Sequence, residues 1–439
     1  MRTRVGAVWR PSPGKRGAFL HRRLVEDGGR GVRVRRLGQT RAGEVKITRF
    51  LRNPAVSVVE MVETAAARTA SRAHGRHVLA IQDTTTVRAA ACGRCIALHP
   101  VIAVDALEGT LLGLVDARFF VRHGGKRGQR KDRDFADKES RRWLDGAQQA
   151  AVLAASGAAR VTVVADREGD IYEDFASRPQ AVEMLIRAGQ DRRLADGSHL
   201  FAKAEALPEA GRMTAELPAA PGRRARTAVL ALRFAQVEIA RPVSRKRNAE
   251  WAALPRSVKL SLVEAREIDP PDGVAAAHWR LLTTHSVTDT ADARRIVGFY
   301  RQRWTIEQLF RTLKTQGFDV EALRVAEGGP FEKLVTASLV AAVTVLQLVR
   351  ERDGVAKRPV EDAFDLDELP ALEAASVSLE GKTERQKNPH PKGSLAYAAW
   401  VLARLGGWTG YYGKPGPVVM LSGLIKFHAV KHGWRLRDV

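Results

Sequence analysis

Two short apolar runs, each followed directly by an aspartate, constrain the fold of this chain more than any other feature. The run Val78–Gln82 precedes Asp83, and the run Val161–Ala165 precedes Asp166. Short aliphatic runs with polar flanks are typical of buried strands. In an α/β sheet, the residue at the end of such a strand projects from the edge where ligands bind. The two aspartates are therefore the first candidates for functional residues.

The rest of the chain alternates between strand and helix patterns, which predicts an α/β fold with a mixed sheet and flanking helices. Residues 101–104 and 111–121 favour strands, and residues from about 138 to 155 favour a helix. One long helix is expected from about Thr290 to Thr315. Further expected elements are a short helix over 171–175, strands over 182–186 and 279–282, a β-rich insertion over about 190–275, and mostly helices after 331.

Carboxylates on separate elements can share divalent metal ions. Asp83 and Asp166 at strand ends and Glu307 on the later helix would supply three of them. Mg²⁺ prefers oxygen ligands and keeps coordination positions open for phosphate oxygens. Two such ions roughly 3.5–4 Å apart would activate a water or a 3′-hydroxyl for phosphoryl transfer. Acids at strand ends are common, so the three residues alone do not establish this site.

The helix around Glu307 carries three further polar residues at helical spacing, namely Tyr300, Arg303 and Lys314. At about 100° per residue, the four side chains fall within roughly 60° of one another. One helix face would then present a hydroxyl, a guanidinium, a carboxylate and an ammonium. A solvated face with ordinary ion pairs one turn apart explains the same spacing. The spacing alone does not decide between these two interpretations.

The series Tyr300-x2-Arg303-x3-Glu307-x6-Lys314 resembles the Y-R-E-K signature of transposases of the insertion-sequence-four family, whose best-known relative is the Tn-five transposase. Gln82–Thr85 resembles the first motif of that family, and Asp166–Tyr172 resembles the second. The resemblance extends from residue 49 to about residue 407, which is most of the chain. Further matches are Arg49–Pro54, Asp137–Ser140 and Ala403–Gly407.

The resemblance implies an RNase H-like catalytic core with a β insertion between the second aspartate and the glutamate. It also implies that Asp83, Asp166 and Glu307 bind Mg²⁺, or Mn²⁺ in its place. Trp279 matches a tryptophan that stacks on a flipped base while a hairpin end forms, but an ordinary core tryptophan explains this residue equally well. The other residues implied to contact DNA are Tyr300, Arg303, Arg311 and Lys314 at phosphates near the cleaved bond, and Arg187 at the transposon end.

Three regions are predicted on this basis. They are a basic N-terminal DNA-binding region over 1–70, a catalytic domain over 71–330 that contains the insertion, and a helical C-terminal region over 331–439. The expected function is cut-and-paste transposition, in which a homodimer binds double-stranded DNA at terminal inverted repeats, cleaves it and joins the 3′ ends to target DNA. Three alternatives remain open: a catalytically silent DNA-binding remnant that inhibits a related transposase, a plain RNase H-like nuclease, and RNA in place of DNA as the substrate, because basic patches bind phosphate rather than sugar.

Charge agrees with a nucleic-acid partner. The chain has 72 Lys and Arg against 49 Asp and Glu, which gives a net charge of +23 and a field that attracts polyanions. Residues 1–50 hold 14 basic and three acidic residues. We expect these to form a basic arm, partly disordered when free, that contacts phosphates; a solubilising tail is the alternative. The residues before Arg49 do not match the helical end-recognition domain that the family would predict.

Membrane and zinc functions are not expected. The longest apolar stretch, Leu334–Leu348, is interrupted by polar residues and predicts a buried helix rather than a membrane span of roughly 18 residues. Cys92 and Cys95 have the spacing of half a zinc site, but no second pair exists. We therefore expect two ordinary loop cysteines, which suit a reducing cytoplasm. The family resemblance implies a bacterial protein in the cytoplasm, associated with the nucleoid.

Other polar residues favour structural roles. Glu168 and Asp170 follow Asp166 closely, and their sequence neighbours Arg167 and Arg160 favour ion pairing over metal binding. His99 and His123 lack the paired spacing of a metal site, so both are expected to be structural or on the surface.

Overall fold

A computed structural model describes residues 12–89, 94–121, 139–218, 224–243, 249–325, 327–411 and 413–436. Contacts within the chain divide it into two compact units, and each is described by itself. Unit 1 comprises Met1–Ala73, Thr84–Arg122 and Thr305–Val439, and unit 2 comprises His74–Asp83 and His123–Trp304. The chain therefore passes from unit 2 to unit 1 directly after Asp83 and again directly after Trp304.

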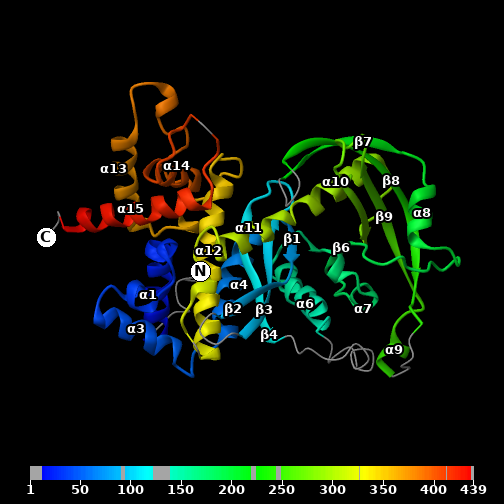
Figure 1. Cartoon of the computed structure of the whole chain (residues 1–439), viewed down its shortest axis with the longest axis horizontal. Coiled ribbons are helices and arrows are strands. Elements are labelled where there is room, and N and C mark those ends of the chain that lie inside the picture. Colours follow the sequence, from blue (N-terminus) through cyan, green and yellow to red (C-terminus); the bar gives the residue numbers. More distant parts are fainter. Residues whose placement is uncertain are drawn as a thin grey trace. The chain divides into compact units, whose positions relative to one another are not determined.

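The described residues of unit 2 form seven strands that are hydrogen-bonded in the order β1-β5-β6-β10-β9-β8-β7. Figure 1 labels β1 and β6 to β9 among them. Strands β1, β5 and β6 are parallel, and the remaining neighbours are antiparallel. The long strands β7 to β9 confirm the β-rich insertion. The seven strands are β1 (His77–Gln82), β5 (Arg160–Ala165), β6 (Glu183–Arg187), β7 (Gly211–Leu217), β8 (Arg226–Ala240), β9 (Ser257–Glu267) and β10 (His278–Thr283).

Helices cover both faces of these strands. Helix α6 (Arg141–Ala155) packs on β1 and β5, and α10 (Thr290–Arg301) packs on β6, β8 and β9. Every residue of β1 and β5 except the first is buried. The predicted aliphatic runs are therefore core strands. The shorter helices of unit 2 are α7 (Tyr172–Ala176), α8 (Leu200–Ala206) and α9 (Ala249–Ala253).

Unit 1 combines an antiparallel group of three strands with most of the helices. Strand β3 pairs with both β2 and β4, and helices α4 and α12 pack against β4. The first half of the unit consists of α1 (Ser12–Asp27), α2 (Val34–Gly38), α3 (Arg41–Leu51), α4 (Val58–Ala73), β2 (Thr85–Ala89), β3 (Arg94–Asp105) and β4 (Leu111–Val121). The second half consists of α11 (Trp304–Leu313), which starts in unit 2, followed by α12 (Gly328–Glu351), α13 (Leu369–Leu379), α14 (Leu395–Leu405) and α15 (Pro417–Leu436).

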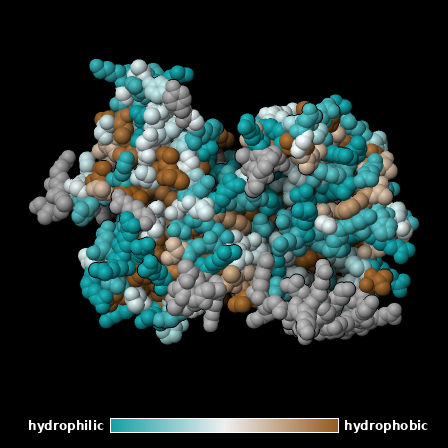
Figure 2. All heavy atoms as spheres, in the orientation of Figure 1, coloured by the Kyte–Doolittle hydropathy of each residue, from teal (hydrophilic) through white to brown (hydrophobic). Residues whose placement is uncertain are grey.

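Helix α12 is the only helix among the described residues that is long and apolar enough to cross a membrane. Of its most apolar window, 83% is buried inside the protein, which is typical of a core helix. The predicted buried helix at Leu334–Leu348 is thus confirmed. The C-terminal part of unit 1 does expose some apolar side chains, among them Val377 and Val418. Figure 2 shows hydrophobic residues as brown spheres on the face in view.

The N-terminal region differs from its prediction. Residues 12–51 form three helices instead of a partly disordered arm, while residues 1–11 lie outside the described part. Leu20 and Leu24, one helical turn apart in α1, are completely buried, as are Leu37 and Ile47 in α2 and α3. The many exposed arginines had masked this apolar spacing, which is why composition alone suggested disorder.

The predicted single helix over 290–315 is also wrong, because it is two helices. At the junction the backbone N–H groups of Gln302 and Arg303 donate to the carbonyls of Phe299 and Tyr300, three residues back, at 3.1 and 3.0 Å. These tighter turns end α10 at Arg301 before α11 begins. The single face expected to carry all four signature residues is therefore broken at the junction, where Arg303 lies, between Tyr300 in α10 and Glu307 in α11.

Several smaller predictions can be followed as well. His99 is completely buried and its Nδ1 is 2.9 Å from the Thr84 hydroxyl, which confirms a structural role. Cys95 is in strand β3 and not in a loop. Cys92, His123 and the pair Asp137 and Lys138 lie outside the described residues.

Candidate active site

The ends of the three parallel strands in unit 2 bring predicted site residues together. Strand β1 pairs with β5 so that Ile81 is opposite Val164, and β5 pairs with β6 so that Ala165 is opposite Ile186. The same registers, continued past the strand ends, align Asp83 with Asp166 and Asp166 with Arg187. Neighbouring strands are about 4.8 Å apart. Two carboxylates and a guanidinium thus form a row along one edge of the sheet.

The turn after β5 fixes Asp166 through close packing. Its Oδ1 accepts a hydrogen bond from the backbone N–H of Glu168 at 2.9 Å, which caps a short 3₁₀ turn. Gly169 ends that turn against the sheet. A Cβ atom at this position would lie 2.7 Å from Ala165 and 3.2 Å from Trp143, so only glycine fits.

Asp170 joins this turn to the segment that follows β6. It is buried, and its Oδ1 accepts from Nε of Arg192 at 2.7 Å. Its Oδ2 accepts from the backbone N–H groups of Gly189 and Gln190 at 2.8 and 3.0 Å. The turn that follows Asp166 and the segment that follows Arg187 are therefore held together by one buried ion pair.

The predicted ion pairing of Glu168 and Asp170 is confirmed, but their partners differ from those expected. Asp170 pairs with Arg192, and Glu168 pairs with Arg142 at 3.2 Å, in place of Arg160 and Arg167. Each true partner is more than twenty residues away in the sequence. Sequence neighbours gave no signal for either contact.

Tyr300 at the end of α10 and Arg303 in the turn after it reach this edge of the sheet. Nη1 of Arg303 donates to Oδ2 of Asp83 at 2.9 Å. Tyr300 is buried, and burial raises the pKa of its hydroxyl; nearby Asp166 also raises it, while the charges of Arg303 and Arg187 and a hydrogen bond from Arg187 act against this shift. The tyrosine therefore stays protonated at neutral pH and can donate a hydrogen bond.

Trp279, which is on β10, lies beside Tyr300 of α10. The two ring centroids are 5.9 Å apart, with 59° between the ring planes. The indole is half-buried, so Trp279 is not a fully enclosed core residue. Arg187 anchors the same strand, since its Nη2 donates to the carbonyl of His278 at 2.9 Å.

The remaining predicted site residues belong to unit 1. Glu307 is in the first turn of α11 and is half-buried, whereas Arg311 in the last turn is exposed. Lys314 follows the helix, and its Nζ donates to the carbonyl of Thr86 at 2.5 Å and lies 3.6 Å from Glu321.

One comparison with known proteins decides the family. A family model described as a transposase DDE domain matches residues 74–343, more than half of the chain. The chain belongs to the DDE transposases. The mixed sheet with flanking helices is accordingly the RNase H-like core predicted for it. As a member of this family, the transposase is an enzyme that acts on DNA. DDE transposases generally use divalent metal ions.

The transposase presents two carboxylates whose chemistry suits such ions. Asp83 and Asp166 end adjacent parallel strands and offer hard oxygen ligands. Glu307 belongs to unit 1, whereas the aspartates belong to unit 2. Within the described residues no group of three or more His, Cys, Asp or Glu is placed to hold a metal ion. The three-acid metal site thus stays a prediction.

Proposed function

We propose that this transposase moves DNA by a cut-and-paste route of the insertion-sequence-four type. It would bind double-stranded DNA at terminal inverted repeats, cleave it and join the 3′ ends to target DNA. The observation that carries the proposal is the row of Asp83, Asp166 and Arg187, with Arg303 paired to the first acid. Two adjacent carboxylates with a guanidinium group on each side suit a metal-bridged phosphate, because the acids attract cations and the arginines attract phosphate oxygens.

Three acids are proposed as the metal ligands of this reaction. Asp83, Asp166 and Glu307 would hold divalent ions, with Mg²⁺ as the natural ion and Mn²⁺ able to replace it. When bound, the ions would activate the attacking oxygen and stabilise the leaving oxygen.

The neighbouring side chains would orient the DNA. Arg303 is held at the edge of the sheet by Asp83, and its guanidinium presents several donors suited to a phosphate. Tyr300 keeps its proton and would donate to a phosphate oxygen from a buried position. Arg311 and Lys314 of unit 1 are proposed to contact phosphates near the cleaved bond, and Arg187 the transposon end. Trp279, half-buried next to Tyr300, is proposed to stack on a flipped base at the DNA end.

Transposition by this route requires two DNA ends to be processed together. We therefore propose a homodimer on DNA, with one active site for each end, in the bacterial cytoplasm at the nucleoid.

The proposal is tested by strand joining. Purified protein is incubated with Mg²⁺, a labelled duplex that carries the ends flanking the gene, and a supercoiled target plasmid. The expected result is label joined to the plasmid through the 3′ end, lost in EDTA. Cutting without joining would instead identify a plain nuclease, and end binding without cutting would identify a silent remnant.

A further inference from the structure

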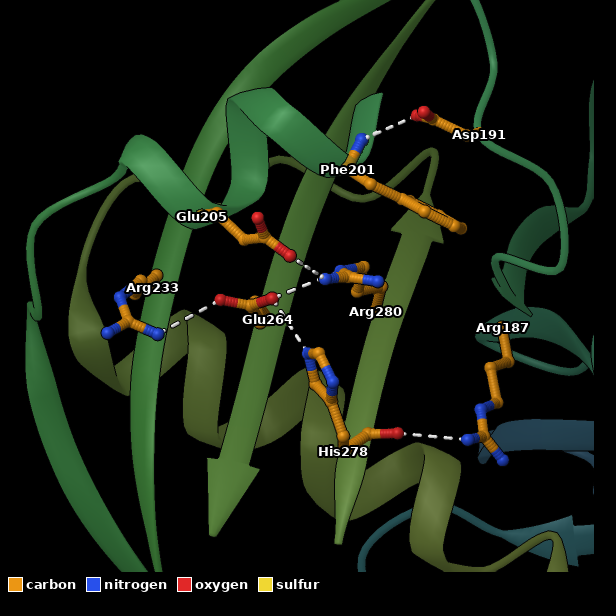
Figure 3. A network of polar contacts seen from close by, with 8 residues as sticks. All are labelled: Arg187, Asp191, Phe201, Glu205, Arg233, Glu264, His278 and Arg280. Atoms are coloured by element: carbon orange, nitrogen blue, oxygen red, sulfur yellow. Dashed lines mark hydrogen bonds and ion pairs between the residues drawn. The ribbon is translucent and has the colours of Figure 1, made fainter. Parts of the chain in front are cut away.

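A buried carboxylate in the β-rich insertion has two arginines and a histidine as partners. Glu264 on β9 is only 1% exposed. Its Oε1 is 2.8 Å from Nε2 of His278 and 3.1 Å from Nε of Arg280, and its Oε2 is 3.0 Å from Nη1 of Arg233 (Figure 3). Burial alone would raise the pKa of this carboxyl, but hydrogen bonds from the three partners and the electrostatic effect of His278 lower it to about 2. Glu264 is therefore ionised at neutral pH.

The partners are arranged across neighbouring strands. Arg233 on β8 and Arg280 on β10 are both directly opposite Glu264 in the strand registers, so one acid separates two arginines. Helix α8 lies over Glu264 and its partners on one face of the sheet, as Figure 3 shows. Glu205 of α8 pairs with Arg280 at 2.8 Å, and the Arg280 guanidinium lies 4.3 Å from the ring centroid of Phe201.

His278 and Arg280 flank Trp279 on β10. Because successive side chains of a strand point to opposite faces, His278 and Arg280 share the face of Glu264 and Trp279 points to the other. That other face is where Trp279 meets Tyr300 of α10. Opposite Trp279 on β9 is Ala265, whose small side chain leaves room for the indole.

This arrangement makes the register of β10 depend on one charge. A slip of one residue would move every side chain of β10 to the opposite face. Glu264 would then be opposite Trp279 or Leu281, depending on the direction of the slip, and would lose both partners that β10 provides, which leaves a buried charge with too few partners. The observed register thus satisfies Glu264, whereas a slip of one residue would not.

We propose that Glu264 is a positioning residue that fixes the register of β10 and so holds Trp279 on the α10 face of the sheet, where it stacks on an unpaired base. This inference rests on the base-stacking role proposed above for Trp279. It assigns Glu264 no contact with DNA or metal, since it lies on the opposite face of the sheet from Trp279.

The test follows base stacking and strand cleavage separately. Stacking is measured by the fluorescence change of 2-aminopurine placed next to the cleaved end, and nicking is measured on the same duplex. Glu264→Gln keeps the shape of the side chain but removes its charge. We expect its stacking amplitude to fall about tenfold, as with Trp279→Ala, while nicking is retained. Because Glu264 acts through Trp279, the double variant should lose no more stacking than Trp279→Ala alone.

Arg226→Gln is the matched control. It breaks the other buried ion pair of β9, Arg226 with Glu267 at 2.7 Å, which does not involve the side chains beside Trp279. This variant should lose stability but keep the stacking amplitude. Unchanged stacking in Glu264→Gln, or losses that add up in the double variant, would overturn the inference.

A second measurement needs no DNA. The acrylamide quenching of Trp279 is obtained as the difference between each protein and its Trp279→Phe counterpart. Quenching should rise in Glu264→Gln and stay unchanged in Arg226→Gln; equal quenching in all three proteins would refute the positioning role. If the wild-type protein neither cuts nor joins DNA, the proposed function fails while this measurement still decides on Glu264.

Discussion

At the scale of single residues, the pairing of Arg303 with Asp83 links a predicted metal ligand to a predicted phosphate contact. Arg303→Ala should lower single-turnover cleavage about 10²- to 10³-fold, the usual loss when a group that stabilises developing charge is removed. Arg303→Lys should recover only part of this loss, because an ammonium cannot bind two oxygens in parallel as the guanidinium does.

Arg301 provides the control for this substitution. Two residues earlier, its Nη2 donates to the backbone carbonyl of Glu216 at 3.1 Å, away from both aspartates. Arg301→Ala should leave cleavage within a few-fold of wild type. Equal losses at the two arginines would show that general helix damage, and not the contact with Asp83, explains the effect.

The buried pair of Asp170 and Arg192 should matter far more for stability than its exposed neighbour. Asp170→Asn places an amide against three N–H donors and leaves Arg192 unpaired, at a cost of about 3–5 kcal/mol in the free energy of unfolding. Glu168→Gln, which breaks the exposed pair with Arg142, should cost about 0–1 kcal/mol. Urea unfolding of both variants measures the difference, and similar losses would contradict the structural role of Asp170.

Residues that end buried strands could be predicted from the sequence, whereas their neighbours across loops could not. Asp83 and Asp166 follow runs that are hydrophobic enough to mark a core strand, and the parallel register then aligns the two acids. Arg192 is in a loop with no periodic pattern, and its role depends on how that loop folds back over Asp170. The position of Glu264 between two arginines likewise required the strand registers.

At the scale of elements, two imidazoles and a hydroxyl connect β1, β5 and the end of β10. The hydroxyl of Thr162 is 2.9 Å from Nε2 of His77 and 2.8 Å from Nε2 of His285. Burial and the positive charges of Arg160, Arg295 and Arg178 together lower the pKa of His285 to about 4, against the opposing effect of Glu183. His285 is thus neutral in the folded protein.

This shift predicts a loss of stability in acid. The unfolded chain binds a proton at His285 near pH 6.5, well above the folded value, so its contribution is complete above pH 6.5 and falls as the pH drops towards 4. Between pH 7.5 and 5 the wild-type protein should lose about 2 kcal/mol more than His285→Gln, measured by urea unfolding at each pH. His21, whose pKa burial also lowers to about 4, acts equally in both proteins. Equal losses would refute the prediction.

Element boundaries show the limits of periodicity. The apolar pattern continues through residues 302–303, and hence predicted one helix, but local hydrogen bonds to the third preceding residue divide it. Conversely, the many charged residues over 12–51 suggested partial disorder, but this segment forms three helices that bury leucines at helical spacing. In both cases hydrogen bonding and packing determined the outcome, and neither can be read from composition.

At the scale of the whole molecule, the order of elements was enough to predict the fold class. Two parallel strands that end in acids, a β-rich insertion and a helix with Glu307 occur in the predicted order, and the family match covers all of them. The predicted division at residues 70 and 330 stays a prediction. Spatial contacts group the chain differently, because unit 1 is built from three separate segments. Such grouping depends on contacts between distant segments that no local pattern indicates.

The central claim is that this transposase cleaves DNA with metal ions held by three acids. The most direct measurement is single-turnover cleavage of the labelled end duplex in Mg²⁺ by the wild type and by Asp83→Asn, Asp166→Asn and Glu307→Gln, with end binding measured in parallel. We predict that each substitution abolishes cleavage and preserves binding, since each removes a ligand charge from the proposed metal site without altering the basic surface. Retained cleavage by any of the three variants would contradict the claim.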